Sequence, residues 1–268
     1  MRYGSAKHAT TPSCGAGETA DNRPFAGKLA QRAAGGAASS PPSLPLRKHL
    51  MIGKWRPKEP FSGVSHAIGA GLSLAGLLAL LILARGRPWH TTAFALYGAS
   101  LIILYTASAL YHCLRVRPEA ERRLQQFDHI AIYGLIAGSY VPLCLLPLRG
   151  AWGWSVLGIE LGLAAVGIAI VLLWRTAPDW VRIAIYVAMG WLILIALGPL
   201  HHALPPASFA WMIAGGVVYS LGAVVFATDR PHLWPGRFSA HDLWHLFVLG
   251  GSACHFMVML SLTGAAGA

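Results

Sequence analysis

Two histidines lie four residues apart at the start of the last apolar segment, in the run SAHDLWHLFVLGGSACHF at 239–256. If this run is helical, His241 and His245 leave the same face, because four residues make about one turn. Two imidazoles on one face can bind a single metal ion, but a complete site needs ligands from elsewhere in the chain. The pair therefore directs attention to other polar residues that the fold would bring to the same level.

The composition indicates a membrane protein. Of the 268 residues only 12% are charged, against about 25% in an ordinary soluble domain, and the mean hydropathy is +0.54. Seven apolar runs follow one another, each near the roughly 20 residues that a helix needs to cross about 30 Å of hydrocarbon. We therefore expect an all-α integral membrane bundle of seven transmembrane helices. The expected spans are 64–83, 92–112, 129–148, 152–174, 181–199, 208–227 and 242–263.

The chain divides into two parts of unlike composition. Residues 1–58 are basic and of low complexity, without a periodic apolar pattern, and predict a disordered tail. No apolar core of signal-peptide length follows the early basic residues, which argues against a secretory signal. Met51 stands just before the organised region, so a start of translation there is a hypothesis that an intact mass would test. The seven-span domain is expected at 59–265.

Lysines and arginines predict the orientation. With a cytoplasmic N-terminus, thirteen of them fall in inside segments and three, Arg85, Arg87 and Arg149, in outside segments. The excess of basic residues on the cytoplasmic side favours this orientation, with the C-terminus outside. The net charge of +11 does not indicate nucleic acid, because no nucleic-acid-binding motif accompanies it. Compact loops and the missing signal are consistent with a bacterial cytoplasmic membrane.

In this orientation, polar residues distant in sequence converge at the cytoplasmic ends of their spans. Ionisable groups at membrane depth are costly and usually pair or serve a function. Three imidazoles and a carboxylate make a suitable environment for zinc. The residues expected at this level are His66 of the first span, Ser108 and His112 of the second, Asp128 and His129 of the third, and His241 and His245 of the seventh.

Structural explanations stay open beside the functional ones. The two histidines of the last span could hydrogen-bond backbone groups at the interface, Asp128 could cap the third helix, and Ser108 could bond to its own helix. His66 and His129 suit packing or support of the ligands better than direct ligation. His255 lies ten residues beyond His245, about 15 Å along the helix, and so cannot share its ion. His201 and His202 are expected in an outer loop.

These motifs resemble the hemolysin III family, within the larger group of progestin and adiponectin receptors. The resemblance covers about 59–263 and is carried by EPFSGVSHAIGAG at 59–71, SALYH at 108–112, FDHIAIYGLIAGSYVP at 127–142 and HDLWHLFVLGGSACHF at 241–256. It implies zinc held by His112, His241 and His245, with Asp128 and Ser108 in catalytic positions. Glu59, His66, His129 and Asp242 would surround the ligands. Many relatives have Asn where this chain has Ser62, which leaves the role of that position open.

The resemblance also implies an activity. A zinc-dependent hydrolase of lipid amide or ester bonds would act on ceramide-like substrates with a long acyl chain, drawn from the lipid bilayer. The alternatives are a non-enzymatic protein of membrane homeostasis or a receptor-like protein with structural zinc, and a cytolysin. A pore-forming cytolysin would need a polar lining, and the expected spans carry few charged residues away from the cytoplasmic end.

Overall fold

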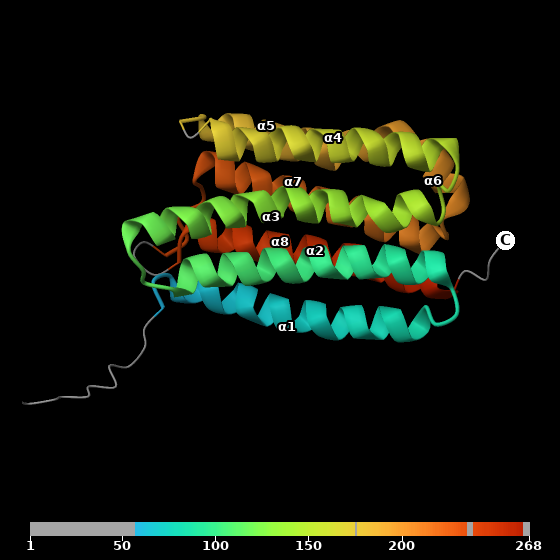
Figure 1. The fold of residues 1–268 in the computed structure, drawn as a ribbon, viewed down its shortest axis with the longest axis horizontal. Coiled ribbons are helices and arrows are strands. Elements are labelled where there is room, and N and C mark those ends of the chain that lie inside the picture. The colour runs from blue at the N-terminus through green and yellow to red at the C-terminus, as the bar shows by residue number, and fades with distance from the viewer. Residues whose placement is uncertain (1–56, 175, 235–237, 265–268) are drawn as a thin grey trace, which may run out of the picture. The chain divides into compact units, whose positions relative to one another are not determined.

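The computed structural model describes residues 57–174, 176–234 and 238–264. Almost all of the predicted tail therefore lies outside the described residues. Within the described ranges the chain is mainly helical, and the helices run side by side (Figure 1). They are α1 (Pro60–Leu83), α2 (Pro88–Cys113), α3 (Pro118–Leu145), α4 (Ala151–Leu173), α5 (Asp179–Trp191), the 3-10 helix η1 (Leu192–Ala196), α6 (Leu197–Ala203), α7 (Pro206–Thr228) and α8 (Ala240–Gly264).

Seven helical segments are long and apolar enough to cross a membrane, which confirms the predicted seven-span membrane bundle. Six of them are single helices. The fifth, Asp179–Ala203, is interrupted by the 3-10 turn η1 in place of the continuous span expected. Backbone groups freed by such an interruption need other partners inside a bilayer. The hydroxyl of Tyr140 is one of them, because it accepts a hydrogen bond from the backbone N–H of Ile193 and donates to the carbonyl of Met189.

The third span begins eleven residues earlier than its apolar pattern predicts. The run PEAERRLQQF at 118–127 is charged and polar, so hydropathy places it outside the membrane, yet it forms the first turns of α3. Asp128 is consequently the eleventh residue of a helix and cannot be its N-cap, which removes one structural explanation for this carboxylate. His201 and His202 likewise lie on the short helix α6, not in the loop expected.

The helices pack as a closed ring. Each packs on the next in the order α1, α2, α3, α4, α5, α7 and α8, and contact between α1 and α8 closes the ring. In Figure 1 the starts of α1, α3 and α8 and the end of α2 all lie at the left end of the bundle. This convergence brings the motif residues of four different helices to one level.

Close approach of two helices depends on glycine at two places. A Cβ on Gly63 would collide with the thiol of Cys113, so glycine lets the start of α1 lie against the end of α2. A Cβ on Gly153 would collide with the backbone carbonyl of Cys144, and glycine there closes the turn from α3 to α4. Small residues at helix contacts are typical of membrane bundles, where backbones approach closely.

Candidate metal centre

Three histidine rings from two helices point their nitrogens at one another. The Nε2 atom of His241 lies 3.5 Å from Nε2 of His112 and 3.0 Å from Nε2 of His245. Each ring offers one nitrogen as a ligand, and these three nitrogens all lie within 4.8 Å of one another. Tetrahedral zinc with Zn–N bonds of 2.0–2.1 Å would separate its nitrogen ligands by about 3.3 Å. The three imidazoles therefore fit a metal ion with three protein ligands, and we call them the histidine cluster.

A carboxylate fixes the ring of His112. Oε2 of Glu59 lies 2.6 Å from Nδ1 of His112, and the backbone N–H of Glu59 donates to the carbonyl of His112 over 2.9 Å. With its proton on Nδ1, this ring presents an unprotonated Nε2 to the cluster. The hydrogen bond lowers the pKa of Glu59 from its ordinary value of 4.5 to about 2 against the opposing effect of burial. Such carboxylate–histidine pairs orient metal ligands and raise their basicity.

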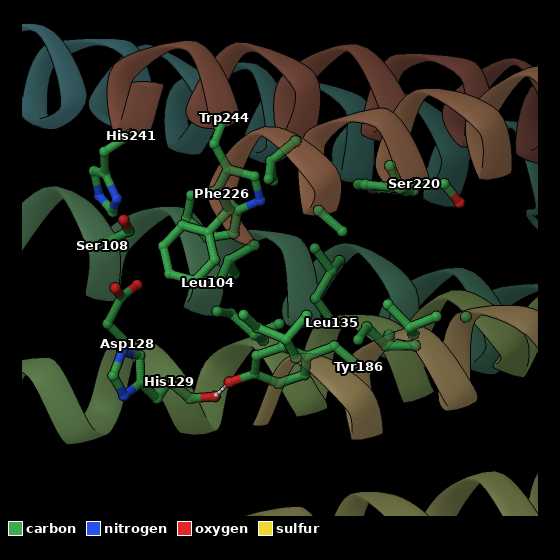
Figure 2. A pocket seen from close by; sticks show the side chains of 18 of the residues that line it. Leu104, Ser108, Asp128, His129, Leu135, Tyr186, Ser220, Phe226, His241 and Trp244 are labelled. Atoms are coloured by element: carbon green, nitrogen blue, oxygen red, sulfur yellow. Dashed lines mark hydrogen bonds between the residues drawn. The ribbon is translucent and has the colours of Figure 1, made fainter. Parts of the chain in front are cut away.

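Asp128 and Ser108 lie beside the cluster, Asp128 on α3 and Ser108 one turn before His112 on α2. Figure 2 shows the Asp128 carboxylate on α3 and the Ser108 hydroxyl on α2 pointing toward each other, with the ring of His241 nearby. Both side chains are buried. A carboxylate at this point can hold or accept a proton beside the cluster.

The start of α8 is held by a reciprocal cap. The backbone N–H of Asp242 donates to Oγ of Ser239, and the backbone N–H of Ser239 donates to Oδ2 of Asp242 over 2.9 Å. This capping box fixes the first turn, which carries His241. The other carboxylate oxygen of Asp242 accepts a hydrogen bond of 2.6 Å from the buried hydroxyl of Ser62 on α1. Ser62 therefore does have a polar partner.

His66 supports the cluster by packing. Its ring is buried and stacks on His245 at 3.9 Å, while its edge meets Tyr105 at 4.9 Å. His129 does not belong to the group of ligand nitrogens, and its backbone carbonyl accepts a hydrogen bond from the hydroxyl of Tyr186 on α5. Both placements agree with roles outside direct ligation.

The cluster lies at one end of a large cavity inside the ring. Its volume is about 1130 Å³, at the upper end of small-molecule sites. On α3 the lining runs from Gln125 to Leu143, a rise of about 27 Å at 1.5 Å per residue. Most of this wall is apolar, including Leu104, Leu135 and Ile136. The cavity is thus nearly as long as the hydrocarbon core is thick, and the histidine cluster lies at one end of it.

Several residues beside the site were not singled out by their position or spacing in the sequence. Trp244 and Phe226 form an aromatic wall beside His241 (Figure 2), with ring centroids 5.5 and 5.8 Å from its own. The hydroxyl of Tyr105 bonds Ser252 over 2.7 Å and so ties α2 to α8. Helical spacing offered a hint for Tyr105, which is one turn before Ser108 on the same face. The aromatic pair could be found only from the tertiary fold.

Comparison with known proteins places the chain in a family. A family model described as haemolysin-III related matches residues 54–256. Hemolysin-3 of Bacillus cereus is 40% identical over 205 residues, which cover 76% of this chain and 90% of that protein. The Bacillus subtilis hemolysin-3 homolog is 36% identical over 205 residues, with 93% of its length covered. The human monocyte to macrophage differentiation factor is 27% identical over 176 residues, 63% of this chain and 69% of that protein. The chain is a multi-pass membrane protein that belongs to the haemolysin III family.

Proposed function

We propose that this chain is an intramembrane zinc-dependent hydrolase that cleaves amide or ester bonds of lipids, with ceramide-like molecules as the substrate class. The observation that carries the proposal is the position of the histidine cluster at the polar end of a long apolar cavity. An acyl chain would lie along Leu104, Leu135 and Ile136. Its carbonyl carbon would then stop near the cluster, between His241 and Asp128.

The chemistry is divided among the residues of the site. His112, His241 and His245 hold the zinc ion, which when bound supplies a Lewis acid that polarises a carbonyl and activates water near neutral pH. Asp128 accepts a proton from the water while the oxygen of that water bonds to the carbonyl carbon. The C–N or C–O bond of the lipid then breaks, and Asp128 delivers that proton to the leaving nitrogen or oxygen. Ser108, whose hydroxyl points toward this carboxylate, would help to keep it in position.

The cellular setting follows from the same proposal. We infer that the N-terminus is cytoplasmic and the C-terminus outside, on the distribution of lysine and arginine. The cluster then lies near the cytoplasmic face of the cell membrane, where a lipid substrate of the inner leaflet could enter. The ordered catalytic unit extends over 59–265, preceded by the basic low-complexity tail at 1–58.

The first experiment measures metal in detergent-purified protein. We expect about one zinc per wild-type chain by mass spectrometry and none in a His241→Ala/His245→Ala double variant, because too few ligands remain. Wild-type protein that binds no metal, purified without chelators, would contradict the proposed cofactor. Loss of zinc in the double variant alone would not distinguish a catalytic ion from a structural one.

Turnover of a lipid panel separates those two roles. Asp128→Asn keeps the shape of the side chain but cannot accept a proton, so we expect hydrolysis to fall about 10²–10⁴-fold while zinc stays bound. Asp179→Asn is the matched control, since this carboxylate lines the same cavity and pairs with Arg182 away from the cluster. Zinc-loaded protein without activity on ceramides, other amides or esters would overturn the enzymatic proposal.

One observation favours a structural ion as the second candidate. His112 lies on α2 and His241 on α8, and these helices are not neighbours in the ring order. An ion bound by both would tie two helices that α1 separates in the ring, in a non-enzymatic protein of membrane homeostasis or a receptor-like protein. Removing zinc would then mainly lower the thermal stability, and Asp128→Asn would have little effect. Lysis of cells, which the name of the Bacillus relative suggests, would be detected as leakage from vesicles.

A further inference from the structure

Glu160 is an acidic residue buried in the bundle without a partner. Its side chain is 0% exposed, and neither carboxylate oxygen has a hydrogen-bond partner among the described residues. It is the tenth residue of α4, about 14 Å from the start of that helix, and so lies within the hydrocarbon region. Desolvation strongly disfavours an isolated carboxylate anion at such a depth.

No basic side chain is placed to neutralise Glu160. In the described ranges every lysine and arginine lies between helices or within the first two turns of one. The titratable groups that act on Glu160 are Tyr140 and Cys144 of α3, and both carry no charge in their protonated forms. A carboxylate anion would therefore stand alone here, whereas a carboxylic acid would need only an acceptor for its proton.

The interrupted fifth span packs against the helix that carries Glu160. The 3-10 helix η1 contacts α4 and breaks the α-helical hydrogen-bond pattern of this span. Tyr140 bridges this break, accepting the N–H of Ile193 over 2.9 Å and donating to the carbonyl of Met189 over 2.6 Å.

We propose that Glu160 is a proton-binding site of the bundle, held as a neutral carboxylic acid. Tyr140 connects this site to the cavity, because it lies near enough to Glu160 to interact with it electrostatically and also lines the cavity wall. Loss of the proton would draw the Tyr140 hydroxyl toward the new anion and away from Met189. The fifth span would then loosen from α3. This inference is independent of zinc and of hydrolysis.

Infrared spectroscopy of the full chain at neutral pH tests the proposal. We expect the C=O stretch of a protonated carboxyl group, equivalent to one group per chain, to be lost in Glu160→Gln. Glu119→Gln is the matched control, because Glu119 is exposed and its carboxylate pairs with Arg122. Its spectrum in this region should equal that of the wild type. Identical spectra of the wild type and Glu160→Gln would overturn the proposal.

Two further measurements keep the test decisive. Wild-type protein labelled with ¹³C-glutamate should show the same band shifted, which assigns it to glutamate and not to Asp128 even if the variant fails to fold. An unshifted band would overturn the proposal.

A bound metal cation is the competing occupant of this site. If sodium or potassium raises the melting temperature of the wild type but not that of Glu160→Gln, the site holds that cation and not a proton, and the proposal is overturned. Zinc content should be equal in all these proteins.

Discussion

The bond between Glu59 and His112 gives the sharpest prediction about the proposed metal centre. Replacing Glu59 by Gln preserves the size of the side chain but removes the negative charge that lies 2.6 Å from Nδ1 of His112. A neutral amide attracts the Nδ1 proton less strongly, so Nε2 becomes a weaker and less well oriented ligand. We therefore expect zinc to bind more weakly while the fold is retained.

The expected loss can be bounded. Removing such a partner of a metal-binding histidine typically weakens metal affinity 10–100-fold, or about 1.4–2.8 kcal/mol. The Glu59 side chain is 44% exposed, and solvent screens interactions of exposed charges. The loss should accordingly lie near the lower end, about tenfold.

Competition with a coloured zinc chelator would measure this affinity in detergent. Glu121→Gln is the control, because its side chain is 41% exposed and bonds Lys58 over 2.8 Å without touching the cluster. It should keep wild-type affinity. A Glu59→Gln variant within twofold of the wild type would refute the reasoning, and an equal loss in both variants would point to the overall charge of this surface.

Two predictions concern the packing that positions the site. Ser62→Ala removes the buried hydroxyl bonded to Asp242, and we expect a loss of about 1.5 kcal/mol in the free energy of unfolding; Ser65→Ala, whose hydroxyl bonds only the backbone of its own helix, should be nearly neutral. Gly153→Ala places a methyl group against a backbone carbonyl that cannot move aside, so we expect a loss of about 1–3 kcal/mol. Gly158→Ala on the same helix meets nothing within 4 Å and should be neutral or slightly stabilising. Thermal or denaturant unfolding in detergent checks all four variants, and equal effects within either pair would contradict the corresponding contact.

Much of the fold could be predicted because the bilayer imposes strong limits on a sequence. Helices of about 20 apolar residues are one of the few ways to cross it, so the number of spans follows from hydropathy alone. The limits weaken where the chain leaves the hydrocarbon. The charged first turns of α3 were missed for this reason, because hydropathy carries no signal for a helix outside the membrane. The break at Leu192–Ala196 lies inside a span and was missed because its residues are as apolar as those of a continuous helix.

The residues of the site could be named from spacing, but their contacts could not. A four-residue interval places His241 and His245 on one face in any helix. That His112 meets them depends on how the ring of helices closes, as does the bond of Ser62 to Asp242, 180 positions away. Long-range pairs of this kind leave no periodic pattern in a single sequence.

The sequence by itself therefore determined the seven spans and the candidate ligands, because local apolarity and helical periodicity are properties of short segments. The tertiary structure decided which nitrogen of His112 faces the cluster, how far the cavity extends, and that Glu160 lies buried without a partner. Each of these depends on the distance between atoms of different helices. Those distances are set by the packing of the whole ring, which no segment of the chain contains.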